Sequence, residues 1–78
     1  MIALKLHKAL YQAAAVDEAV RVYGPHATLE RGDEGEHFIV RIVGSTPARE
    51  HRVAGELGNY ALGITIKTRA TEPGEREG

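Results

Sequence analysis

The stretch Ile64-Thr65-Ile66-Lys67-Thr68-Arg69 decides between two folds for this chain. Its side chains alternate between apolar and polar, and most of them are β-branched, which favours a strand. With a strand here the element order is βαββαβ, as in ferredoxin-like folds. If the preceding helix instead runs through Gly63, the order is βαββα. Local preference favours the strand, and both orders are carried forward.

The segment before this stretch has the pattern of an amphipathic helix. Thr46 can cap its first turn, and Pro47 suits the first helical position because its missing N–H needs no partner there. Apolar residues then recur at helical spacing. These residues are Val53, Leu57, Tyr60, Ala61 and Ile64. Gly63 is the expected C-cap if the helix stops before the strand.

Working further outward, residues 2–7 alternate as a half-buried strand does. Residues 12–23 carry apolar positions at helical spacing, and Gly24-Pro25 predicts a left-handed stop to that helix. Residues 27–31 and 36–43 read as two strands joined by a turn over residues 32–35. The second and third strands therefore form a hairpin.

Together these elements predict an α+β fold, a two-layer sandwich with an antiparallel sheet and the helices on one face. The order is βαββα with the fourth C-terminal strand left open. Residues 1–70 form a single domain, and residues 71–78 read as a flexible charged tail.

The composition is that of an ordinary globular chain. It has 78 residues with 42% apolar and 27% charged residues, and its net charge is -1. That balance argues against nucleic-acid or membrane-surface binding, which rely on an excess of Lys and Arg. No leader and no apolar stretch near the roughly 20 residues of a membrane span is seen, so we expect a cytoplasmic protein. The chain has no cysteine, so it holds no iron–sulfur cluster.

Nothing in the sequence assembles an enzyme, and we expect no catalytic residues and no cofactor. Asp17 and Glu18 are adjacent on a helix and point about 100° apart, so they are not a carboxylate pair. Ser45 has no evident His and Asp partners. His7 and His37 are the weak candidates for a metal site, since neighbouring first and third strands would place both on the helix-free face. We nevertheless expect no metal.

The helix-free face is the expected partner surface. It combines apolar Ile39 and Val43 with charged residues, and such a face favours a homodimer or another protein partner. The charged residues expected there are Lys5, Glu30, Arg41, Lys67 and Arg69. It has no paired aromatic side chains for stacking RNA bases.

Several segments between residues 9 and 62 carry a likeness to a known family. Leu10-Tyr11 precedes an Ala-rich helix, the segments Ala27-Thr28-Leu29 and Phe38-Ile39-Val40 form a strand pair, and Glu56-Leu57-x-Asn59-x-x-Leu62 follows. In these segments the chain resembles the HxsD-like proteins of bacterial His-Xaa-Ser peptide-maturation systems. It departs from them after Leu62, where the family continues as a charged helix.

The resemblance implies a non-enzymatic accessory protein that works with a radical-type maturation enzyme and its precursor peptide. Glu56 and Asn59 are then candidate partner contacts, or else they fix the helix to its neighbour. Tyr11 and Tyr60 are candidates for peptide stacking, although packing at the core edge is the alternative. With Ile39 and Arg41 they complete the expected binding residues. The alternative function is a small homodimeric ferredoxin-like regulatory or ligand-binding domain.

Overall fold

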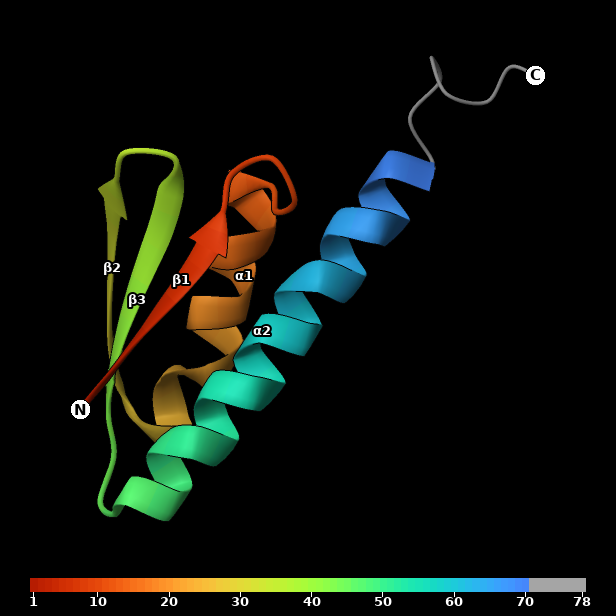
Figure 1. The fold of residues 1–78 in the computed structure, drawn as a ribbon. Helices are drawn as coiled ribbons and strands as arrows, with labels where there is room; N and C mark the ends of the chain where they lie inside the picture. Colours follow the sequence, from red (N-terminus) through yellow and green to blue (C-terminus); the bar gives the residue numbers. More distant parts are fainter. Residues whose placement is uncertain (71–78) are drawn as a thin grey trace.

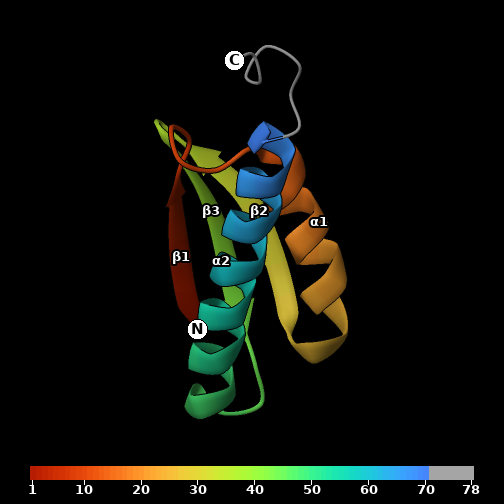
Figure 2. The ribbon, with the colours of Figure 1, turned by 90° about the vertical axis from the view of Figure 1, so that its right-hand side faces the viewer.

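An antiparallel sheet of three strands and two helices make up the computed structural model, which describes residues 1–70 (Figure 1). The strands are β1 (Ile2–His7), β2 (Thr28–Glu34) and β3 (His37–Val43), and the helices are α1 (Ala13–Tyr23) and α2 (Pro47–Ala70). Both helices cover the same face of the sheet (Figure 2). The predicted α+β sandwich is confirmed in its βαββα form. The tail predicted for residues 71–78 lies outside the described residues.

The fourth strand predicted from local preference is wrong, because α2 continues to Ala70. Helical continuation buries Thr65 to 1% exposure, one turn after buried Ala61. The backbone N–H of Gln12, just before α1, donates to Thr65 Oγ1 at 3.1 Å. A contact between residues so distant in sequence outweighs the few tenths of a kcal/mol that each β-branched residue costs in a helix. Gly63 is therefore an interior helical position and not a C-cap.

The predicted hairpin is confirmed, with a shorter turn than expected. β2 runs on through Gly32, Asp33 and Glu34, and Glu34 pairs with His37. Only Gly35 has a positive φ, at 59°, among the described residues. Glycine at the first position of a two-residue loop matches the type II′ turn, whose backbone suits the twist of the flanking strands.

The predicted stop after α1 is at the right place but has a different geometry. Gly24 has φ -52° and ψ -38°, which is right-handed, so no left-handed cap forms. The chain instead tightens into a 3₁₀ turn over Gly24–His26 with Pro25 near its start. Proline fits there because its fixed φ is compatible with a first helical turn.

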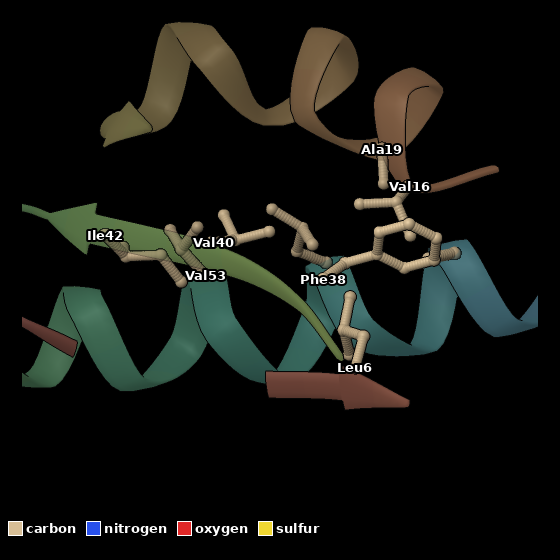
Figure 3. Packing of buried hydrophobic residues seen from close by; sticks show 9 residues of the cluster. Leu6, Val16, Ala19, Phe38, Val40, Ile42 and Val53 are labelled. Carbon is tan, nitrogen blue, oxygen red and sulfur yellow. The ribbon is translucent and has the colours of Figure 1, made fainter. Parts of the chain in front are cut away.

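The core lies between the sheet and the helix layer. Phe38, Val40 and Ile42 of β3 point towards the helices, and Leu6 and Val16 lie around Phe38 (Figure 3). Val53, Leu57 and Ala61 of α2 complete the inner layer. Each large aliphatic side chain buried in this way contributes about 1.5–3 kcal/mol. The alternation predicted for residues 2–7 and the strand predicted for residues 36–43 therefore both contribute to the core.

The entry to α2 is fixed by two side chains. Thr46 Oγ1 accepts the N–H of Arg49 at 3.1 Å, which confirms the predicted cap. Buried Glu50 accepts the N–H of Gly44 at 3.0 Å and lies 3.0 Å from the ammonium of Met1. The Gly44 hydrogen bond, and then the ammonium, lower the pKa of Glu50. A Cβ at Gly44 would lie 3.2 Å from Cγ of Glu50, so glycine gives this carboxylate room.

No helix within residues 1–70 combines the length and the apolar character that crossing a bilayer requires.

Candidate functional site

The sheet face away from the helices is the first part of the candidate site. Strand register and the burial of Phe38, Val40 and Ile42 show which residues point away from the helices. They are Ala3, Lys5, His7, Thr28, Glu30, Gly32, Glu34, His37, Ile39, Arg41 and Val43. The predicted placement of Lys5, Glu30, Ile39, Arg41 and Val43 on this face is confirmed. Lys67 and Arg69 belong to α2, so their predicted place on this face is wrong.

Ile39 is not available as the apolar contact that we expected. It lies at the centre of the open face, between its register partners Lys5 and Gly32, and is only 4% exposed. The ammonium of Lys5 reaches across β3 to within 3.9 Å of Glu34 on β2. Neighbouring side chains therefore leave Ile39 almost no exposed surface, whereas Val43 at the end of β3 is 48% exposed and is the accessible large apolar side chain among the described residues of this face. Arg41 is exposed there, as expected.

His7 and His37 lie side by side on this face, as the strand order predicts. They are register partners, and their ring centroids are 4.9 Å apart with an edge-to-face geometry. His7 Nδ1 accepts the N–H of Ala9 at 3.0 Å, and Nε2 lies 3.4 Å from Glu36. Within residues 1–70 no group of three or more His, Cys, Asp or Glu residues is arranged to hold a metal ion.

The outer edge of β2 is the second part of the candidate site. The N–H of Lys8 donates to the C=O of Glu36 at 2.8 Å, which extends the β1–β3 ladder by one pair. By the alternation of an antiparallel ladder, the odd-numbered residues of β3 then bond to β2. The N–H and C=O groups of Leu29, Arg31 and Asp33 consequently point outward. This edge can accept an added strand.

The side chains along this edge differ between its two faces. On the helix side, Arg31 Nε lies 2.6 Å from Asp17 of α1, and its Nη1 donates to Asp33 at 3.0 Å. Its guanidinium also lies 4.9 Å from the Phe38 ring centroid, in a cation–π position. On the open side, Glu30 and Glu34 are exposed carboxylates. An added strand would therefore meet a fixed Arg31 on one face and acidic groups on the other.

The remaining predicted binding residues lie elsewhere, so the six do not form one site. Glu56 and Asn59 are exposed on α2, and Glu56 lies 3.7 Å from Arg52 of the same helix. Within the described residues, neither Glu56 nor Asn59 forms a hydrogen bond or ion pair that ties α2 to a neighbouring element. Tyr60 is 38% exposed, and Tyr11 is partly buried against the core.

The outer side of α2 near Tyr60 adjoins the end of α1. The ring of Tyr60 meets that of Tyr23 edge to face, with centroids 5.9 Å apart. On α1, the Arg21 guanidinium donates hydrogen bonds to Glu18. That contact lowers the pKa of Glu18 and raises that of Arg21. One side of the Tyr60 ring therefore contacts α1 through Tyr23, and the other side is exposed.

A basic cleft at the start of α2 was not foreseen from the sequence. A hollow of about 610 Å³ lies between the 3₁₀ turn and the loop before α2, with His26, Ser45 and Arg49 in its lining. An adjoining hollow of about 240 Å³ is lined by Tyr23, His26, Arg49, Arg52, Val53 and Glu56. In the sequence, the only sign of this cleft is that Arg49 and Arg52 lie close together at a helix start. The sequence does not show that His26 lines the same cleft.

Comparison with known proteins gives no relative. No protein-family model matches the sequence, and no curated protein or solved structure was found to match it.

Proposed function

We propose that this protein is a non-enzymatic accessory or peptide-binding protein of a radical-enzyme-dependent peptide-modification system. It acts in the cytoplasm, and it holds the precursor peptide as a strand added to the edge of β2. The observation that carries the proposal is the outward row of backbone groups at Leu29, Arg31 and Asp33. The resemblance of the segment from Glu56 to Leu62 supports the choice of pathway.

The edge of β2 suits a peptide better than the edge of β1. On β1, the C=O of His7 already accepts the N–H groups of Leu10 and Tyr11, at 2.9 and 3.0 Å. The chain after β1 therefore closes over one end of that edge. No comparable backbone bond from a turn or loop reaches Leu29 or Arg31 within residues 1–70.

The charges beside β2 favour a particular kind of peptide. Glu30 and Glu34 are exposed on the open face, next to the position that an added strand would occupy. A peptide with Lys, Arg or protonated His at alternate positions would place those side chains over the two carboxylates. This preference agrees with the His-containing precursor that the resemblance implies.

A small regulatory or ligand-binding domain is the second candidate. The observation in its favour is the cleft lined by His26, Arg49 and Arg52, because such side chains recognise a carboxylate or phosphate. In this candidate the protein binds a small anionic molecule and works as a homodimer.

Affinity capture from the host lysate, with mass spectrometry of the bound proteins and peptides, tests the proposal. We expect the tagged protein to recover a cysteine-rich radical enzyme or a short His-containing peptide. E30K/E34K should reduce that recovery at least tenfold, since it places positive charge beside the peptide. R49E/R52E, a charge change of equal size at the cleft, should leave recovery unchanged.

Two outcomes would count against the added-strand proposal. Recovery of the tagged protein alone would remove the stable complex on which it depends. Loss of the partner with R49E/R52E but not with E30K/E34K would move the binding site to the cleft and favour the second candidate.

A further inference from the structure

One stripe of α2 is exposed although it has the features of a contact surface. The stripe consists of Glu56, Tyr60, Gly63 and Lys67, which share one side of the helix at spacings of three and four residues. A shallow hollow of about 420 Å³ with mainly apolar walls lies over its second half. The residues that line this hollow are Asn59, Tyr60, Gly63, Ile64 and Lys67.

Within residues 1–70, no contact explains why Gly63 lacks a side chain. It is exposed in the interior of α2, and among the described residues a Cβ built there would meet no atom within 4 Å beyond the adjacent turns of its own helix. Glycine at such a position costs about 1 kcal/mol of helix stability relative to alanine. The space above Gly63 is therefore room that a large side chain from another molecule can fill.

The stripe is complementary to itself when two α2 helices lie antiparallel. A two-fold axis passing between Ala61 and Leu62 sets Tyr60 beside the partner's Gly63. The same axis sets Glu56 beside the partner's Lys67. Both contacts then occur twice, as in every isologous interface. A large ring meets a glycine, and an acid meets a base, so both shape and charge agree.

We propose that the protein forms a homodimer through this stripe, with the two α2 helices antiparallel. The exposed side of each Tyr60, whose ring keeps its contact with Tyr23, faces the hollow over the partner's Gly63, and the Glu56–Lys67 pairs flank the contact on both sides. The occupant is a second copy of this chain because the stripe carries both members of each contact. One two-fold axis pairs Tyr60 with Gly63 and Glu56 with Lys67. This surface is separate from the sheet edge assigned to the peptide, so the inference does not depend on the proposed function.

The expected strength follows from the length of the stripe. From Glu56 to Lys67 the contact covers about 16 Å of helix, at 1.5 Å per residue. So short a contact buries less than the roughly 800 Å² per partner of a standard stable interface. We therefore expect a reversible dimer that forms as the concentration rises from about 10 μM to 1 mM.

Sedimentation equilibrium of the full chain over that range tests the proposal. The natural chain should show monomer and dimer in exchange. Gly63→Leu should weaken dimerisation at least tenfold, since the new side chain occupies the place of the partner's Tyr60. Gly55→Leu is the matched control: Gly55 is also exposed and open on α2 but lies on another side of the helix. It should leave the dimer unchanged, and circular dichroism should show both variants folded.

A charge exchange identifies the antiparallel arrangement. Glu56→Lys and Lys67→Glu should each weaken the dimer, and the double variant should recover most of the loss. The two residues lie too far apart on one helix to pair with each other, so rescue can come only from pairing between subunits. A chain that stays monomeric up to 1 mM would overturn the proposal. So would a dimer that Gly63→Leu leaves unchanged, or single losses without rescue.

Discussion

At the scale of single residues, Glu50 is the charged group most closely tied to the fold. It is 7% exposed, and its carboxylate joins the loop before α2 to the amino group of Met1. A carboxylate at a helix start is also favoured by the helix dipole. The hydrogen bond from Gly44 comes first among the causes that lower its pKa. The ionised form of Glu50 therefore belongs to the folded state.

We expect this residue to make stability depend on acid. Because its pKa in the folded chain lies below its ordinary value of 4.5, its contribution is fully present above about pH 4.5. The contribution is lost as the pH falls further, through the lowered pKa. Glu50→Gln should lower the melting temperature by several degrees at pH 7 and have a smaller effect at pH 3. Melting curves followed by circular dichroism between pH 7 and pH 3 measure both effects.

The control for this prediction is Glu30→Gln. Glu30 is exposed on the open face, so its substitution should change the melting temperature little at either pH. If Glu50→Gln behaves in the same way, the buried carboxylate does not stabilise the entry to α2.

Among the helices and strands, the stretch from Ile64 to Arg69 is the one whose secondary structure its local sequence pattern fails to predict. Alternation located β1, the turn residues between two strand-like segments located β2 and β3, and helical spacing located α1 and the first turns of α2. The last turns of α2 carry a strand-like alternation, and what makes them helical is Thr65 packed beside Gln12. Local residue preferences cannot predict this hydrogen bond, because the two residues come together only in the folded chain.

Lysine substitutions at two neighbouring positions test whether residues 64–69 form a helix or a strand. In the helix Thr65 is buried and Ile66 is 58% exposed, whereas an alternating strand would bury Ile66 and expose Thr65. We expect Thr65→Lys to cost about 3 kcal/mol of unfolding free energy or more, because it buries an unpaired charge. Ile66→Lys should cost about 0.5 kcal/mol or less. Urea denaturation measures both, and the reverse order would contradict the helix.

The candidate sites also include features that the sequence predicts and features that only the folded structure shows. His7 and His37 could be expected to lie side by side, because strand order follows from a hairpin and one antiparallel neighbour. The burial of Ile39 could not, since it depends on how side chains of all three strands lie over β3 in the folded sheet. The basic cleft joins a 3₁₀ turn to the loop before α2, and only their meeting in space creates it.

At the scale of the whole molecule, the two layers keep the two proposed surfaces apart. α1 packs against β2 and β3, and α2 packs against β1 and β3. Figure 2 shows α2 in front of the sheet with α1 beside it. In Figure 1 α2 also diverges from the sheet towards its C-terminal end. A second subunit on the α2 stripe would leave the edge of β2 open in both copies.

Dimerisation and partner capture should therefore respond to different substitutions. Gly63→Leu should weaken the dimer at least tenfold and leave the capture of the peptide or enzyme within about twofold of the natural chain. E30K/E34K should have the opposite effect, because Glu30 and Glu34 lie on the sheet and not on α2. Sedimentation equilibrium and affinity capture on both variants give the four results. If Gly63→Leu abolishes capture while the chain stays folded, the partner needs both subunits, and the peptide site cannot be complete on one sheet edge.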